Sequence, residues 1–283
     1  MGIEELMERI SLPEEARRVV RKENMTETVY TEEKQLFYDD FPVFLENWKK
    51  ETGKEKYVCA LALYVRLACE VYPKYREKEI EDEIFDKTFY DITIWCEECY
   101  RKHQVYGLEE LWWLAQSVKM HLFRLGRLQF EPVVLEKDVK VDREGQDTQN
   151  KKISISAGTK VLNVHIPAGE PLDYEACLDS FRLAEAFFGK NQIYMCDSWL
   201  LSPHLKEVLS EKSNILKFQN LFTVIKVYHA YPQAEQRIFQ NVIENKQEYP
   251  EDTSLRRRAK AYILSGKDLG IGIGFIKNIY NYI

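Results

Sequence analysis

Residues 160–201 constrain the fold of this chain more than any other segment. The runs 161–166 and 193–199 have the apolar, β-branched character of strands, and residues 172–188 between them carry apolar side chains at helical spacing. A strand–helix–strand crossover makes its two strands parallel and is almost always right-handed. Ligands of open α/β sheets bind beyond the carboxyl ends of such strands. We therefore expect function where His165 and the Cys196–Ser198 run lie.

The first 125 residues are predicted to be helical throughout. Ser11 and Glu14 have the spacing of a capping box, and apolar residues recur at helical spacing over 58–72, 85–99 and 108–122. Gly126 is placed to end the last helix in a left-handed conformation. Cys96 and Cys99 lie on an apolar helix face with no second pair at metal spacing, so we predict core packing for them. Such amphipathic helices bury their stripes against one another, which predicts a helical subdomain.

After Gly126 the period of the pattern changes to that of strands. Apolar residues alternate over 128–130, 139–141 and 153–155, with Pro132 at an edge or bulge and the polar run 142–152 as a loop. A short helix over 204–209, a strand-prone run 215–228, a helix over 251–265 and a closing strand within 270–279 complete this half. The glycines at 270, 272 and 274 lack dinucleotide-motif spacing and predict a bend or a close backbone approach.

The fold class predicted is therefore α+β, a helical domain over 1–125 followed by a mixed sheet with flanking helices over 126–283. The net charge of −6 argues against nucleic acid as a partner, because phosphate binding requires a positive surface. No run of about 18 apolar residues predicts a membrane helix, and the charged N-terminus does not resemble a signal peptide. Six cysteines without a secretory signal indicate reduced thiols, so we expect a cytoplasmic protein.

Four segments resemble a bacterial family of acyltransferases: FRLGRLQFE (123–131), HIPAGEPLD (165–173), CDSWLL (196–201) and SNILKF (213–218). Members of that family join a helical N-acyltransferase-associated domain to a C-terminal domain resembling the GNAT superfamily. The resemblance covers nearly the whole chain. It implies a GNAT-like sheet and transfer of an acyl group from acyl-coenzyme A to a small-molecule amine, without a metal.

The same resemblance implies where the donor binds. In GNAT domains the fourth and fifth strands, here 161–166 and 193–199, splay apart and admit the pantetheine arm. The N-terminus of the helix that follows the fourth strand meets the pyrophosphate, which assigns Ile166, Pro167, Ala168 and Gly169 to donor binding. The loop departs from the usual Gln/Arg-x-x-Gly-x-Gly/Ala pattern, because only Gly169 remains and acidic residues follow it.

Aminolysis of a thioester needs a base for the amine and an acid for the leaving thiolate. His165 is the candidate base, and Cys196 or Ser198 is the candidate acid. We assign Asn163, Asp197 and Trp199 to the substrate pocket, because the first two lie on or beside these strand ends and Trp199 follows them.

Each candidate also has a structural interpretation. The histidine could hold the turn, the cysteine could be a small buried hydrophobe, the serine could cap the next helix, and Trp199 could belong to the core. Arg124 and Arg127 are interpreted first as ion-pair residues and second as phosphate ligands.

Two other functions remain open at this point. The acidic loop after Gly169 favours a non-catalytic small-molecule-binding protein that retains the GNAT-like fold, because negative charge opposes a pyrophosphate. A thiol enzyme that pairs Cys196 with His165 is the second alternative.

Overall fold

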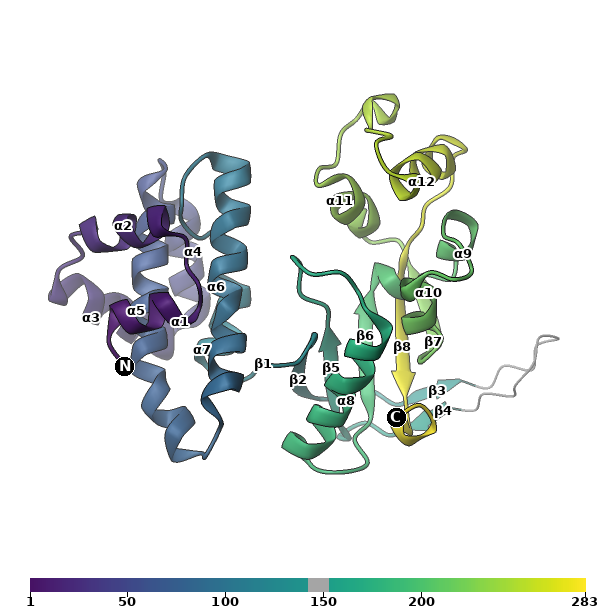
Figure 1. Ribbon diagram of the computed structural model, residues 1–283, viewed down its shortest axis with the longest axis horizontal. Helices are drawn as coiled ribbons and strands as arrows, with labels where there is room; N and C mark the ends of the chain where they lie inside the picture. Colours follow the sequence, from purple (N-terminus) through teal and green to yellow (C-terminus); the bar gives the residue numbers. More distant parts are fainter. Residues whose placement is uncertain (142–152) are drawn as a thin grey trace. The chain divides into compact units, whose positions relative to one another are not determined.

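The computed structural model describes residues 1–141 and 153–283, and the chain within these ranges forms two compact units (Figure 1). The first unit comprises Met1–Leu125 with Pro167–Gly169, and the second comprises Gly126–Ile166 with Glu170–Ile283. The polar run 142–152, predicted as a loop, lies outside the described residues. No helix in the described part of the chain is long and apolar enough to cross a membrane.

The first unit is built from helices, drawn in purple to blue in Figure 1. They are α1 Ile3–Arg9, α2 Glu14–Lys22, α3 Glu27–Asp39, α4 Phe41–Lys50, α5 Glu55–Glu77, α6 Asp82–His103 and α7 Leu111–Val118. α5 is the central helix, because it packs against α1, α2, α6 and α7 and is buried on most of its faces. Cys96 and Cys99 are both buried in α6, which confirms their predicted place in the core.

Two local signals in this half were misleading. Ser11 does not cap a helix; it has a left-handed φ of 53° in the turn after α1, and Pro13 precedes α2 without a side-chain cap. Gly126 does not end a helix either, because α7 stops at Val118 and residues Phe123–Leu125 form a strand. Gly126 (φ 69°) occupies the turn into the next strand, where a Cβ would lie 2.8 Å from the Ser180 Oγ.

The strands form one large sheet and one separate hairpin. They are β1 Phe123–Leu125, β2 Leu128–Val134, β3 Val139–Val141, β4 Ile153–Ile155, β5 Lys160–His165, β6 Tyr194–Ser198, β7 Thr223–Tyr228 and β8 Ile271–Ile276. The six-stranded sheet has the order β1-β2-β5-β6-β8-β7, and β3 pairs with β4. β5 and β6 are parallel, as the crossover predicts, whereas β2–β5, β6–β8 and β7–β8 are antiparallel. The α+β class is confirmed.

The helices of the second unit are α8 Tyr174–Phe188, α9 Leu205–Val208, α10 Asn214–Gln219, α11 Gln233–Phe239 and α12 Ser254–Leu264. The long strand predicted over 215–228 is wrong in its first half, which is α10, followed by β7. Ser213 caps α10 by accepting a hydrogen bond from the Ile215 N–H (3.2 Å), and Phe218 is buried beneath it. A cap and a buried aromatic at helical spacing outweigh β propensity here. α11 was not predicted.

α8 covers one face of the sheet. Its Phe181 ring lies 4.8 Å from Tyr194 of β6 and 5.8 Å from Phe130 of β2, both edge-to-face. The buried Glu185 of α8 accepts hydrogen bonds from the hydroxyls of Tyr194 and Tyr280, each at 2.7 Å. These contacts tie β6 to α8 and to the C-terminal turn.

On the opposite face the β3–β4 hairpin packs its isoleucines against one end of the sheet. Ile153 and Ile155 contact Phe275 of β8, with Met195 and Ile273 beside them.

Candidate active site

The candidate site begins where β5 and β6 separate. Their parallel pairing comprises Leu162 with Tyr194 and Asn163 with Met195, and it stops there. Beyond that point β5 continues to pair with β2 as far as His165, and β6 continues to pair with β8 as far as Ser198. Two strands that each keep only their outer partner present unpaired backbone edges to one another. An extended chain with amide groups can be bound between such edges by backbone hydrogen bonds.

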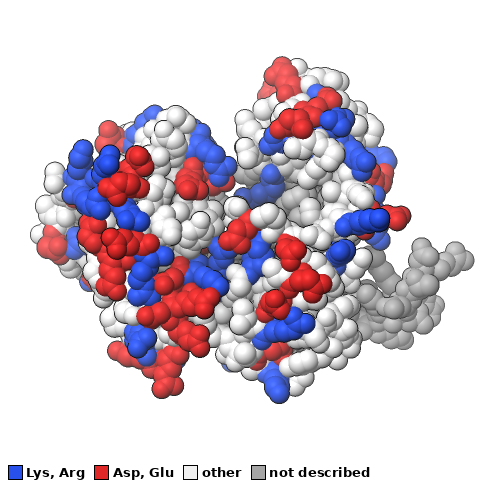
Figure 2. All heavy atoms as spheres, viewed as in Figure 1, with Lys and Arg blue, Asp and Glu red and all other residues white. Residues whose placement is uncertain are grey.

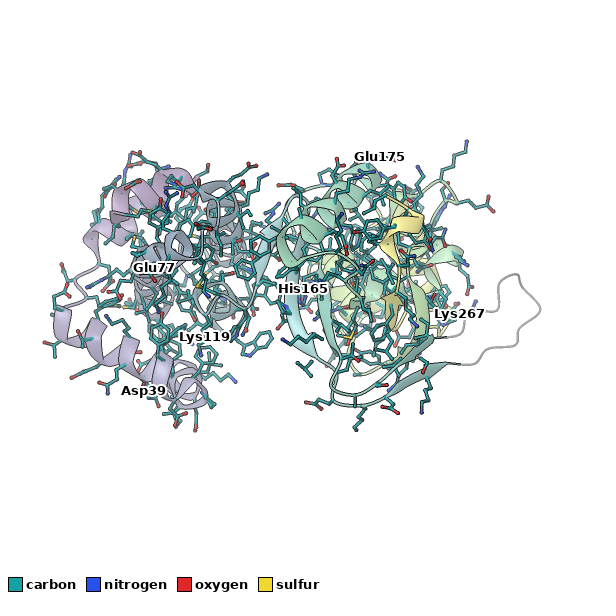
Figure 3. All side chains as sticks on the ribbon, turned by 90° about the horizontal axis from the view of Figure 1, so that it is seen from below. Asp39, Glu77, Lys119, His165, Glu175 and Lys267 are labelled. Carbon is teal, nitrogen blue, oxygen red and sulfur yellow. The ribbon has the colours of Figure 1, made fainter. Side chains whose placement is uncertain are left out.

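His165, labelled in Figure 3, lies at the end of β5 beside a carboxylate of the neighbouring strand. Its Nε2 is 2.9 Å from Oε2 of Glu131 in β2, and the two side chains are 25% and 20% exposed. The Nδ2 of Asn163 donates to the same Glu131 oxygen at 3.2 Å and lies 3.1 Å from the histidine Nε2. When Nε2 carries the proton and donates to Glu131, Nδ1 is the basic nitrogen of the ring. A carboxylate in this position orients the imidazole.

Asp197 lies on the same face of the sheet as His165. Because Asn163 is paired with Met195, alternation along both strands places Asn163, His165, Met195 and Asp197 on one face. The Asp197 Oδ1 accepts a hydrogen bond from the Tyr228 hydroxyl of β7 at 2.7 Å.

Burial and neighbouring groups both shift the pKa of the Asp197 carboxyl group. Although the residue is exposed, burial of the carboxyl group among its neighbours raises its pKa, and Tyr228, His165 and Lys226 oppose that rise. The charge of His165 therefore affects the carboxyl group of Asp197.

Cys196 and Ser198 face the other way. Cys196 is 0% exposed on the face of the sheet opposite His165, and burial raises the pKa of its thiol well above the usual range. The Ser198 hydroxyl accepts a hydrogen bond from the Leu200 N–H (3.2 Å) and caps the short turn Trp199–Leu201. Trp199 packs against the cluster around Leu205 and Val208. The structure brings none of these three side chains to the His165 face.

The segment 166–169 connects β5 to the approach of α8. Gly169 has a φ of 92°, which suits glycine, and a Cβ added there would meet no atom within 4 Å. Asp173 caps α8 by accepting from the Ala176 N–H at 2.9 Å. Arg127 donates from Nε to the Pro171 carbonyl at 2.9 Å and from Nη2 to the Glu170 carbonyl at 2.7 Å. The arginine thus holds the backbone of residues 170–171, just before α8.

Sequence reasoning missed Glu131, Tyr228 and the bonding partners of Arg127. Glu131 carried one usable signal, since Gln129 and Glu131 alternate with apolar residues and so share a strand face. Nothing in the sequence indicated which strand that face would meet.

No group of three or more His, Cys, Asp or Glu side chains within residues 1–141 and 153–283 could hold a metal ion. Figure 2 shows acidic and basic side chains intermingled over the visible face of both units.

Comparison with known families agrees with this geometry. Residues 122–276, more than half of the chain, match the family model of the GNAT-like C-terminal domain. The chain belongs to this family. Residues 1–120 match the N-acyltransferase N-terminal domain, so the resemblance of both halves is confirmed. A search of curated proteins found no match.

Solved structures share the fold of this GNAT-like protein over almost its full length. One is an acyltransferase in complex with decanoyl-CoA and teicoplanin, 22% identical, with a TM-score of 0.74. Another is an acyltransferase in complex with decanoyl-CoA, 20% identical, with a TM-score of 0.75. An acyltransferase mutant in complex with octanoyl-CoA is 21% identical, with a TM-score of 0.74. Each match covers 97% of this chain and 87% of the other.

Proposed function

We propose that this protein transfers an acyl group from an acyl-CoA to the nitrogen of a small-molecule amine, with the chemistry in residues 126–283. The observation that carries the proposal is the separation of β5 and β6 after Asn163 and Met195, with the His165–Glu131 pair at that edge. Membership of the GNAT-like family supports it. So do the decanoyl-CoA, octanoyl-CoA and teicoplanin bound by proteins of the same fold.

The donor enters between the separated strands in this proposal. Its pantetheine amides bond the unpaired edges of β5 and β6, and its phosphate end lies beyond the carboxyl end of β5. The left-handed Gly169 leaves open space for close approach of a ligand. The acidic residues after it make the phosphate end the weaker part of the fit.

The proposed chemistry is aminolysis of a thioester. The acceptor's ammonium gives one proton to His165, and Glu131 stabilises the resulting imidazolium. The neutral amine nitrogen then forms a bond to the thioester carbonyl carbon, and the carbon–sulfur bond breaks. The second nitrogen proton neutralises the thiolate, so the products are an amide and a thiol, and His165 returns one proton to solvent. Because the nitrogen supplies this proton, no buried acid such as Cys196 is needed for this step.

The test is turnover, measured as thiol release from acyl-CoA in the presence of alkylamines. We expect His165→Ala to lower kcat at least ~10²-fold, because general-base catalysis contributes about that much or more. Glu131→Gln should lower kcat by about 10-fold with little change in KM, since the amide cannot stabilise the imidazolium. A merely structural histidine would instead leave kcat near that of the wild-type protein.

His204→Ala is the matched control, because His204 is a half-buried histidine of the second unit that lies 3.8 Å from the acid Glu207. Unfolding midpoints of all variants should be compared with that of the wild-type protein. Loss of turnover in His204→Ala as large as in His165→Ala would contradict the assignment of the base.

We also propose a cytoplasmic location. All six cysteines are outside disulfides, which suits a reducing compartment.

A further inference from the structure

Within the part of the chain that the structure describes, Asp197 is a carboxylate that forms no ion pair. The Tyr228 hydroxyl holds its Oδ1, and none of the described lysine, arginine or histidine side chains forms an ion pair with it. The residue is exposed at the carboxyl end of β6, on the same face of the sheet as His165. Asp179 of α8 is another exposed carboxylate, and it forms an ion pair with Arg182.

The charges around the site favour a cation. Glu131 and Asp197 are carboxylates on the same sheet face as His165, and Glu131 is already engaged by His165 and Asn163. Lys226 of β7 is the basic residue whose charge reaches Asp197, but it forms no ion pair with it. His229 and Asp268, next to the end of β7, neutralise one another at 2.9 Å when the histidine is protonated.

We propose that Asp197, held by Tyr228, is the subsite that binds the acceptor as an ammonium ion, so that the acceptor class is a primary alkylamine. This inference rests on the proposed function. The Tyr228 hydrogen bond fixes one carboxylate oxygen and leaves the other for the ligand. A cation bound at Asp197 lies beside the imidazole that removes its proton.

Asp197 is a specificity residue in this scheme and Tyr228 is a positioning residue. Binding the cation raises its local concentration, and only after transfer of one proton to His165 does the nitrogen attack the thioester. A neutral aromatic amine gains nothing from the carboxylate. The subsite therefore discriminates between amines by charge.

The experiment measures KM and kcat for an alkylamine, protonated at neutral pH, and for an aniline, which is neutral there. We expect Asp197→Asn to raise KM for the alkylamine about 10-fold and to leave KM for the aniline and for acyl-CoA within about 2-fold. Tyr228→Phe should raise the alkylamine KM by a smaller factor. A tetraalkylammonium salt, which cannot react, should compete with the alkylamine in the wild-type protein and lose that competition in Asp197→Asn.

The control is Asp179→Asn, which removes an exposed carboxylate of α8 and should leave every KM unchanged. Equal changes for both amines, or no change for either, would overturn the inference while leaving the acyltransferase intact. Absence of thiol release from the wild-type protein with every amine would instead overturn the proposed function, and the inference with it.

Discussion

His165 and Glu131 are 34 residues apart in the chain and meet through hydrogen-bonded strands. The antiparallel register places Gln129 opposite His165 and Glu131 opposite Asn163, so the carboxylate reaches diagonally to the imidazole. Diagonal neighbours across a strand pair are within reach of long side chains. The proposed base is therefore positioned by two strands, and we expect replacement of either partner to alter it.

Cys196 is expected to be inert toward alkylating reagents in the folded protein. Thiolate is the reactive form, and complete burial both excludes the reagent and raises the pKa of the thiol. Iodoacetamide labelling followed by peptide mass analysis, from about pH 7 to 9, should leave Cys196 unmodified under native conditions and label it after denaturation.

Cys196→Ala should keep turnover within about 3-fold and lower the free energy of unfolding by about 1 kcal/mol, because a small buried group is lost. Rapid labelling of this cysteine in the native protein, or loss of turnover in Cys196→Ala without loss of stability, would instead support the hypothesis of a thiol enzyme.

Among the elements, β8 has glycines where a neighbouring turn leaves no room for a side chain. The turn Trp199–Leu201, which directly follows β6, lies against β8 so closely that a Cβ at Gly272 would be 2.4 Å from the Leu201 carbonyl oxygen. A Cβ at Gly274 would be 2.9 Å from a Leu201 methyl. The predicted close backbone approach is confirmed, and it supports the end of β6 that carries Asp197.

Gly272→Ala should lower the free energy of unfolding by about 3 kcal/mol, since backbone atoms must shift to admit the methyl group. Urea unfolding of the whole protein measures this. Gly158→Ala serves for comparison, because Gly158 has a φ of 81° but open space around its Cβ position. It should cost only about 1 kcal/mol from backbone strain. If the two variants lost equal stability, steric contact with Leu201 would not be the cause.

At the scale of the whole molecule, the family models account for the domain organisation of both halves but do not identify the ligand. The acidic loop and the Asp173 cap at α8 keep a non-catalytic binding protein as the competing function. Titration with acyl-CoA species separates the two, because a ligand that binds only the folded state raises Tm in proportion to the logarithm of its concentration.

We expect decanoyl-CoA at 100 times its Kd to stabilise the protein by about 2.7 kcal/mol, with free CoA as the comparison. The measurement is a melting curve at several ligand concentrations. A Tm that stays constant across acyl chains of all lengths would remove acyl-CoA as the donor and favour the competing function.

The sequence by itself determined many of the elements and indicated the family. Period-2 and period-3.6 patterns located β5, α8, β6 and the helices α5, α6 and α7 of the first unit, because those periods follow from strand and helix geometry alone. Alternation also identified which residues share a face within each strand. The capping patterns at Ser11 and Gly126 were misleading, because both residues lie in turns with a left-handed φ instead of at the predicted helix ends.

Only the tertiary structure decided which faces meet. Pairing Asn163 with Met195 places His165 with Asp197; a shift of one residue would have placed it with Cys196 and Ser198. Register is set by long-range packing, such as that of Phe181 against Phe130 and Tyr194, and no short segment of sequence contains it. For the same reason Glu131 and Tyr228, which belong to strands distant in the chain, became visible only in the folded protein.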